Sequence, residues 1–211
     1  DEVSRIEGVD IIAGTNEKHN IIEYVRNFVK AREQAKEEDT QQICRVLPYE
    51  ALSEYISSGT ISSMESRTRA YIKIQEGCNR FCSYCVIPYA RGKVRSRDKE
   101  EIITEAKQLL ANGIKEIVLT GINTALYGTD TEDGGIAPLL ESLNALPGDF
   151  RIRLSSLEPT VIDADYVKKI LCFDKLCHHL HLSIQSGSDN VLAAMNRRYN
   201  RAEYIEIVKV L

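Results

Sequence analysis

The sequence predicts an α/β protein in which strands and helices alternate over most of the chain. Three observations predict this fold class. Short apolar runs of strand length begin near residue 69 and recur between helical stripes of apolar residues. Helix start and stop signals separate these runs, with Asp98 before one stripe and Asn112-Gly113 after it. Apolar residues make up 43% of the 211 residues and charged residues 27%, as in ordinary globular proteins.

The first 45 residues are predicted to form the end of one domain, and residues 46–68 are predicted to form a linker. Val9–Thr15 reads as a short buried strand, and Asn20–Lys30 carries a helical stripe. One strand and one helix cannot bury both of their faces, so we expect further elements to pack on them. The charged run 31–40 and the Ser/Thr-rich stretch 57–66 predict solvated connections. Cys44 is predicted to be a buried thiol without a ligand role.

Residues 69–211 predict about four strand–helix units. The expected strands are Tyr71–Gln75, Glu116–Leu119, Arg151–Leu157 and His179–Gln185, and the expected helices are Lys99–Ala111, Ala137–Leu146, Asp163–Leu171, Asp189–Met195 and Arg201–Leu211. Repeated units of this kind give parallel strands. Functional sites of such sheets lie at the carboxyl ends of the strands. Polar segments do follow the strands at residues 120–123, 155–158 and 185–187.

Three of the six cysteines, Cys78, Cys82 and Cys85, follow the first of these strands with C-x3-C-x2-C spacing. We expect neither a secretory signal nor a membrane span, so an odd cluster of thiols favours a metal over disulfides. Structural zinc takes four ligands, and no nearby His completes the set. An iron–sulfur cluster held by three cysteines keeps one iron open to a substrate or cofactor. The spacing therefore favours a catalytic cluster, and three core cysteines without a metal are the alternative.

At these residues the sequence resembles the radical S-adenosylmethionine enzymes. The wider string RTRAYIKIQEGCNRFCSYCVIPYARGKVRSR is similar to the methylthiotransferases, and most like the branch that acts on N6-threonylcarbamoyladenosine in tRNA. The match continues through LTGINTALYG, RLSSLEP and HLHLSIQSGSDNVLAAMNRRY. It is strong over residues 68–211 and weak over the first 45. The resemblance implies a partial (β/α) barrel with about four of six units, preceded by the C-terminal part of an N-terminal methylthiotransferase domain.

The resemblance also implies a reaction and its cofactors. Cys78, Cys82 and Cys85 would bind a [4Fe–4S] cluster whose fourth iron takes S-adenosylmethionine, and C2 of the adenosine at position 37, beside the anticodon, would be methylthiolated. The cofactor-binding residues that we expect are Gly121, Asn123, Glu158, Gln185 and Ser186. A second [4Fe–4S] cluster is expected in the full-length enzyme, with ligands that this sequence does not contain. The expected partners are tRNA and an electron donor such as flavodoxin or ferredoxin, and we expect a cytoplasmic monomer that does not bind membranes.

Two further groups of residues have the composition of binding sites. Arg91, Lys93, Arg95 and Arg97 follow the cysteines and predict binding of an anion, either nucleic-acid phosphate or the cofactor carboxylate. The net charge of −4 does not by itself indicate nucleic-acid binding. The second group matches no closed zinc pattern and is predicted to be ordinary buried residues: Cys172, Cys177, His178, His179 and His181.

Several other functions remain open from the sequence. Within the same family, the substrate could be N6-isopentenyladenosine in tRNA or an aspartate of a ribosomal protein. From a different class, the chain could be a zinc-stabilised RNA-binding module without catalysis. A ferredoxin-like electron carrier is disfavoured by the open iron position and by the strand–helix units. Iron and sulfide analysis separates the redox enzyme from the zinc module.

Overall fold

The computed structural model describes residues 2–34, 41–57, 59–61, 68–132 and 134–211. The chain divides into two compact units, residues 1–52 with 56–58 and residues 53–55 with 59–211. The predicted linker 46–68 therefore contributes to both units, and the predicted domain boundaries stay a prediction. Parts of the two expected solvated connections, residues 35–40, 58 and 62–67, lie outside the described residues.

The described part of the smaller unit contains two short strands and one long helix. Strand β1 (Ile11–Ala13) pairs in parallel with β2 (Ile43–Arg45), and α1 (Ile21–Gln34) lies between them in the chain. The sequence analysis predicted β1 and α1 but not β2. Cys44 lies in β2 with an exposed side chain, so the prediction of a buried thiol is wrong. The next residue, Arg45, is exposed too, and consecutive strand residues point to opposite faces, so both faces of β2 are uncovered at this end.

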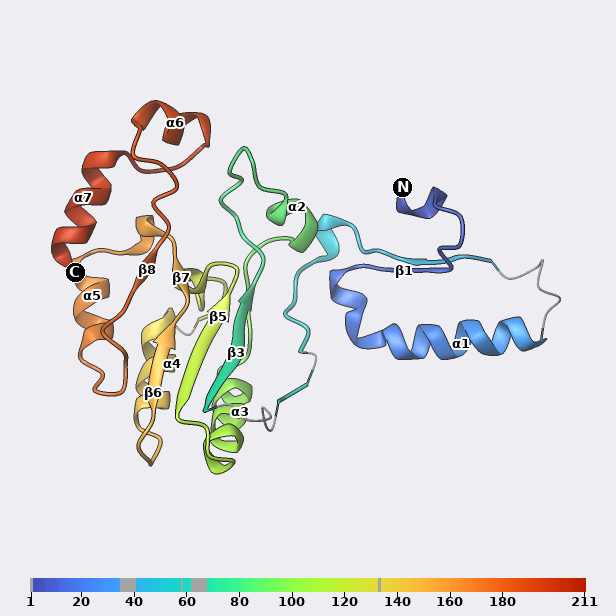
Figure 1. The fold of residues 1–211 in the computed structure, drawn as a ribbon, viewed down its shortest axis with the longest axis horizontal. Coiled ribbons are helices and arrows are strands. Elements are labelled where there is room, and N and C mark those ends of the chain that lie inside the picture. Colours follow the sequence, from blue (N-terminus) through green and yellow to red (C-terminus); the bar gives the residue numbers. More distant parts are fainter. Residues whose placement is uncertain (1, 35–40, 58, 62–67, 133) are drawn as a thin grey trace. The chain divides into compact units, whose positions relative to one another are not determined.

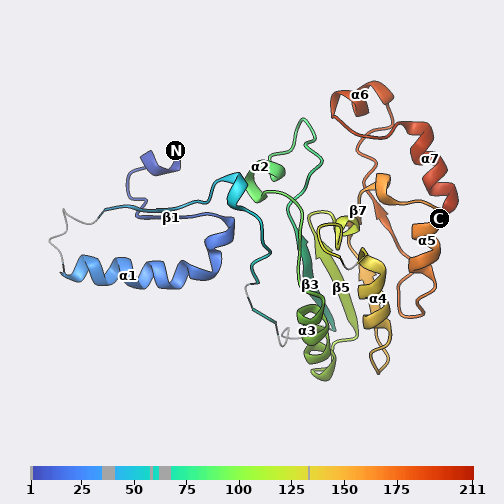
Figure 2. The ribbon, with the colours of Figure 1, turned by 180° about the vertical axis from the view of Figure 1, so that it is seen from behind.

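The larger unit is built on a four-stranded sheet in the order β4-β3-β5-β6. Figures 1 and 2 show β3 and β5 side by side near the middle of this unit. The strands are β3 (Arg69–Glu76), β4 (Arg95–Ser96), β5 (Glu116–Gly121) and β6 (Arg151–Leu154). Strands β3, β5 and β6 are parallel, and β4 runs antiparallel to the end of β3. Two more strands, β7 (Ser156–Leu157) and β8 (His181–Leu182), form a separate parallel pair.

In the described part of the larger unit, helices α2 (Ile87–Arg91), α3 (Lys99–Ala111), α4 (Ile136–Asn144) and α5 (Ala164–Leu171) lie between the strands, and α6 (Asp189–Ala194) and α7 (Arg201–Val210) follow β8. The predicted bounds of α3 are confirmed, and the Asp98 side chain caps it by accepting a hydrogen bond from Glu101 N at 3.0 Å. Asp163 caps α5 in the same way, accepting from Tyr166 N at 2.7 Å. In the described part of the chain, no helix is both long enough and apolar enough to cross a membrane.

The core lies between one face of the sheet and helices α3, α4 and α5. Strand β3 buries Ala70, Ile72 and Ile74, while Tyr71 and Lys73 between them are exposed on the other face. The helices meet the buried face with apolar residues that include Ile102, Leu109, Leu139, Leu143 and Ile170. Each such side chain contributes about 1.5–3 kcal/mol on burial, so this core holds the helices against the sheet.

Two predicted strands differ from the structure in length. The expected strand Arg151–Leu157 is divided at Ser155, whose backbone N donates to Leu119 O at 3.0 Å before β7 turns to pair with β8. The expected strand His179–Gln185 is reduced to the two residues of β8. Beyond β8, Ser186 N donates to Ile184 O at 2.7 Å across a tight turn centred on Gln185, which has a φ of 63°. A residue with that φ cannot continue a strand.

Candidate functional site

The cysteines lie in the loop between β3 and α2, and a glycine makes this loop possible. Gly77 has a φ of +75°, and a Cβ at this position would lie 1.8 Å from Lys93 O. No other residue fits there without moving the backbone. Directly after it, Cys78 N donates to Gly92 O at 3.1 Å. The loop is therefore held against the returning chain that leads into β4.

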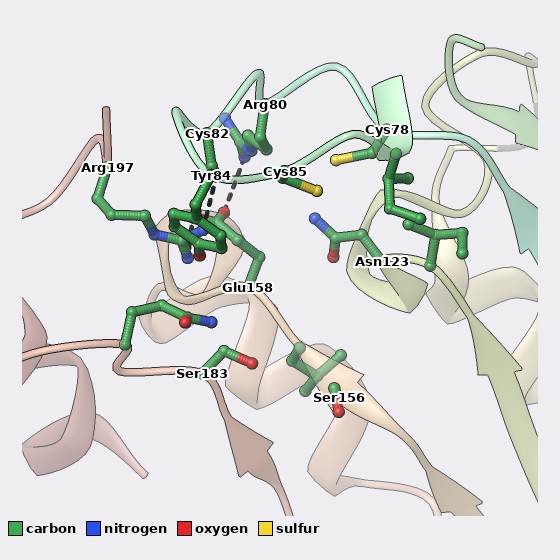
Figure 3. A pocket seen from close by; sticks show the side chains of 14 residues that line it. Cys78, Arg80, Cys82, Tyr84, Cys85, Asn123, Ser156, Glu158, Ser183 and Arg197 are labelled. Carbon is green, nitrogen blue, oxygen red and sulfur yellow. Dashed lines mark hydrogen bonds and ion pairs between the residues drawn. The ribbon is translucent and has the colours of Figure 1, made fainter. Parts of the chain in front are cut away.

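The three predicted cysteines line a single cavity of about 240 Å³ (Figure 3). Their thiols are free and their side chains are half-buried. Figure 3 shows the Cys78 and Cys85 sulfurs directed toward the space beside Asn123. Among the residues that the structure describes, no three His, Cys, Asp or Glu side chains converge on one point as a mononuclear metal site would require. Thiols spread around one cavity suit a cluster in which each sulfur binds a different iron.

Burial raises the pKa of the Cys78 thiol. The bare thiolate is therefore disfavoured at this position, and a coordinated metal ion would supply the positive charge that stabilises it. The rest of the cavity is lined from the ends of other strands and from nearby loops, by Arg80, Tyr84, Ile87, Ile122, Asn123, Ser156, Leu157, Glu158, Ser183, Gln185 and Arg197. The chain thus brings together polar groups from segments that are far apart in sequence.

Asn123 offers this cavity an unpaired acceptor. Its side chain is 5% exposed, and its Oδ1 has no hydrogen-bond partner among the described residues. An unpaired buried carbonyl costs about 1–3 kcal/mol, so a ligand that donates a hydrogen bond would recover this free energy. The backbone of Asn123 is fixed, because its N donates to Gln75 Oε1 at 2.9 Å. The prediction that Asn123 contacts a cofactor therefore has a structural basis.

Gln75 was expected only as the last residue of a strand, without a role at the site. In the structure, its side chain forms the hydrogen bonds that hold the backbone at the end of β3. Its side chain is fully buried, and its Nε2 donates to Glu76 O and to Gly77 O at 2.7 Å each. A Cβ on Gly121 would lie 2.9 Å from Gln75 Oε1, so the glycine makes room for this side chain. The packing of the Gln75 side chain thus explains why a residue without a side chain lies at position 121. The predicted contact of Gly121 with the methionine end of a cofactor stays a prediction.

Glu158 at the end of β7 holds two arginines. Arg80 Nη2 lies 3.0 Å from Glu158 Oε2, and Arg197 Nη2 lies 3.4 Å from Oε1 (Figure 3). Arg197 Nη1 also donates to Cys82 Sγ at 3.1 Å. The Glu158 carboxylate is therefore engaged by protein groups, and its predicted contact with ribose hydroxyls stays a prediction. Sequence reasoning missed both arginines, although the strings that carry the resemblance contain them.

The predicted basic cluster is divided by burial. Arg95 is 1% exposed and Arg97 4%, and both face carboxylates inside the unit. Arg97 Nε lies 3.1 Å from Glu101 Oε2, and Arg97 also pairs with Glu105. Arg95 and Arg97 therefore have internal partners, because β4 pairs with β3 and places both inside, and their predicted binding of an external anion stays a prediction. Arg91 is half-buried and pairs with Glu76 at 2.8 Å. The exposed Lys93 stays a predicted anion contact.

The polar segment 185–187 supplies Gln185 to the cavity lining, and Ser183 lines the cavity from just beyond β8, whereas Ser186 is not among the lining residues. The cofactor contacts of Gln185 and Ser186 stay predictions. Ser186 Oγ accepts a hydrogen bond from Ser188 N at 3.1 Å within its own turn.

The prediction that the nearby cysteines and histidines are buried is wrong. Cys172 and three histidines are exposed and Cys177 is half-buried; the histidines are His178, His179 and His181. His181 Nδ1 lies 2.7 Å from Ser156 Oγ, because β7 and β8 pair at these two residues.

The model of the radical SAM superfamily matches residues 72–211. The chain therefore belongs to the radical SAM superfamily, whose cofactors are a [4Fe–4S] cluster and S-adenosylmethionine. The three thiols and the unpaired Asn123 Oδ1 around one cavity fit these groups.

Curated relatives narrow the comparison. The chain is 42% identical over 199 residues to the threonylcarbamoyladenosine tRNA methylthiotransferase MtaB of Bacillus subtilis (strain 168), covering 94% of this chain and 42% of that protein. The MtaB of Aquifex aeolicus (strain VF5) is 36% identical, with coverage of 100% and 49%. The tRNA-2-methylthio-N(6)-dimethylallyladenosine synthase of Clostridium tetani (strain Massachusetts / E88) is 39% identical, with coverage of 95% and 42%. The chain thus spans less than half the length of these relatives.

Solved structures share the fold. The apo form of the cobalamin-dependent S-adenosylmethionine radical enzyme OxsB matches with a TM-score of 0.63 at 11% identity, covering 94% of this chain and 31% of that one. The radical S-adenosylmethionine methyltransferase TsrM from Kitasatospora setae matches with a TM-score of 0.55 at 19% identity, covering 66% and 28%. The predicted fold class, an α/β partial barrel, is confirmed.

Proposed function

We propose that this chain is part of a tRNA methylthiotransferase that modifies C2 of N6-threonylcarbamoyladenosine at position 37, next to the anticodon. The observation that carries the proposal is the cysteine-lined cavity at the carboxyl ends of the strands in a radical SAM chain. The names of the two MtaB relatives support the choice of nucleoside. On this proposal the protein works in the cytoplasm, with tRNA as substrate and a small electron-transfer protein as donor.

In this function, Cys78, Cys82 and Cys85 each bind one iron of the cluster. When bound, the cluster and S-adenosylmethionine supply the one-electron chemistry that activates an otherwise inert adenine carbon. Asn123 Oδ1 accepts a hydrogen bond from a donor group of the bound cofactor, because it has no other described partner. The buried Leu157 in the cavity lining would help to exclude water from the reacting groups.

Mass spectrometry of tRNA nucleosides from a strain that lacks the gene tests this proposal. We expect the methylthio form of threonylcarbamoyladenosine to disappear and its unthiolated precursor to accumulate. A loss confined to the methylthio form of N6-isopentenyladenosine would transfer the assignment to the second candidate. That candidate is favoured by the 39% identity to the dimethylallyladenosine synthase of Clostridium tetani. No change in any nucleoside would contradict both and would direct the test to a ribosomal protein.

The cofactor is tested separately by metal and sulfide analysis of the full-length protein purified without oxygen. We expect iron and acid-labile sulfide in equal amounts. Zinc without sulfide would overturn the redox function and favour a zinc-stabilised RNA-binding module.

A further inference from the structure

The segment that follows α6 lies directly on the cysteine loop. Ser83 N donates to Met195 O at 3.1 Å, and Ser83 Oγ donates to Ala194 O at 2.8 Å. From the same segment, Asn196 Nδ2 donates to Phe81 O at 2.9 Å. These bonds join positions more than 110 residues apart, and they place the next residue, Arg197, beside Cys82.

Arg197 is held in place on several sides. Its side chain is 6% exposed, and its Nη2 lies 3.4 Å from Glu158 Oε1. Its guanidinium stacks on the Tyr199 ring at 5.1 Å from the ring centroid. The Tyr199 hydroxyl is itself anchored, 2.8 Å from both Ser183 O and Ile184 O. The Nη1 group that donates to Cys82 Sγ at 3.1 Å is therefore fixed before any cofactor binds.

The charges beside Cys82 do not cancel. Two guanidiniums, of Arg80 and Arg197, share the single carboxylate of Glu158. This leaves one net positive charge next to a thiol that is proposed to bind iron. Reduction of an iron–sulfur cluster adds one negative charge, and hydrogen bonds to its sulfurs are among the factors that set its potential. A fixed donor and a positive charge stabilise the reduced form more than the oxidised form.

We propose that Arg197 is a positioning residue that raises the reduction potential of the cluster through its hydrogen bond to Cys82 Sγ. The inference rests on the proposed role of Cys82 as a cluster ligand. The step that it affects is the entry of one electron from an external donor. No covalent bond forms or breaks in that step, and no proton is transferred. We expect Glu158 to lower the reduction potential of the cluster, because its negative charge disfavours the reduced form.

The test is a redox titration of the full-length protein with its clusters loaded, followed by electron paramagnetic resonance, and the signal that is missing from Cys82→Ala is assigned to the cluster in this cavity. For Arg197→Met we expect the reduction equilibrium to become about tenfold less favourable, which lowers the potential by about 59 mV for one electron. For Glu158→Gln we expect a shift in the opposite direction. Arg153→Met is the matched control, since Arg153 donates to the buried Glu116 at 3.0 Å at the other end of the sheet. It should lower stability and leave the potential unchanged.

An Arg197→Met protein with full iron and sulfide and an unchanged potential would overturn the proposal. Arg197→Lys keeps the cation and should show a smaller shift than Arg197→Met. If neither variant retains a cluster while circular dichroism shows a folded chain, Arg197 serves assembly and the tuning role is wrong. A wild-type protein without iron and sulfide is a different failure, because it overturns the proposed function itself.

Discussion

Glu116 and Glu158 are buried carboxylates at opposite ends of the larger unit. Both pair with arginines, but their surroundings differ. Glu116 begins β5 at the amino end of the sheet, with its side chain 7% exposed. Its oxygens lie 2.7 Å from Arg69, 3.0 Å from Arg153 and 3.5 Å from Arg151. It joins the first residues of β3, β5 and β6, and no cysteine is among its partners in the part of the chain that the structure describes.

Glu158 lies at the carboxyl end of β7, with its side chain 8% exposed and two arginines as partners. In this network, however, the Nε atoms of Arg80 and Arg197 are buried without a hydrogen-bond partner among the described residues. The same network contacts a thiol and lines a cavity. Ion pairing alone therefore does not distinguish a structural group from a functional one. The thiol and the cavity beside Glu158 make that distinction, since an unsatisfied atom also occurs in the internal network of Arg97, whose Nη2 is buried without a described partner.

The largest expected effect is at the cysteines. Cys82→Ala in the full-length enzyme should abolish assembly of the cluster in this cavity and formation of 5′-deoxyadenosine, because a cluster held by two thiolates is not retained. The second expected cluster keeps its own ligands, so the iron content should fall by about half. Iron analysis and chromatography of the reaction products measure both. Cys172→Ala is the matched control, since this exposed thiol donates only a local hydrogen bond to Lys169 O. A Cys82→Ala protein with full iron content would refute the assignment of the site.

The next largest effect is expected at the amino end of the sheet. Glu116→Gln should lower the free energy of unfolding by about 2 kcal/mol, because it removes a buried carboxylate that accepts charged hydrogen bonds. The half-exposed Arg69 and the exposed Arg151 keep the loss below that of a fully buried pair. Urea denaturation measures the stability, and isothermal titration measures binding of S-adenosylmethionine. A change in cofactor affinity would show that the two ends are not independent.

The effect of Glu116→Gln on the free energy of unfolding should depend on pH. The hydrogen bond from Arg153 holds the pKa of Glu116 below its ordinary value of 4.5, against the opposing effect of burial. A depressed folded-state pKa contributes stability above the unfolded-state pKa, and this stability is lost as pH falls through the folded-state value. The difference in unfolding free energy between wild type and Glu116→Gln should therefore be constant above about pH 5 and shrink in more acidic solution. A difference that grows on acidification would contradict this sign.

The smallest effect compares two asparagines. Asn123→Ala should weaken binding of S-adenosylmethionine about tenfold, the loss of one hydrogen bond, with little change in stability. Its Oδ1 has no described protein partner to lose, and its backbone bond to Gln75 is retained. Asn144→Ala should lower the free energy of unfolding and leave binding of S-adenosylmethionine unchanged, because Asn144 Oδ1 accepts a hydrogen bond from Lys175 N at 3.0 Å. Isothermal titration and urea denaturation of both variants measure the two effects. Equal cofactor affinity in wild type and Asn123→Ala would exclude the predicted contact.

The sequence by itself determined the parts that depend on local chemistry. Asp98 and Asp163 mark the starts of α3 and α5, because a side-chain cap acts within three residues. The spacing of Cys78, Cys82 and Cys85 indicated an iron–sulfur site, and the predicted Asn123 and Gln185 line the same cavity. These features were accessible because a helix cap and a short motif are both local in sequence.

Only the tertiary structure decided which distant groups meet. Arg197 reaches Cys82 across 115 positions, and no local pattern specifies such a pairing. Arg95 and Arg97 have the composition of a basic surface, yet β4 pairs with β3 and turns both inward. The strand expected at residues 151–157 is divided at Ser155, because β6 continues the main sheet while β7 pairs with β8. Burial and strand partners are properties of the assembled chain, so the fate of a charge or of a strand end follows from packing and not from its neighbours in sequence.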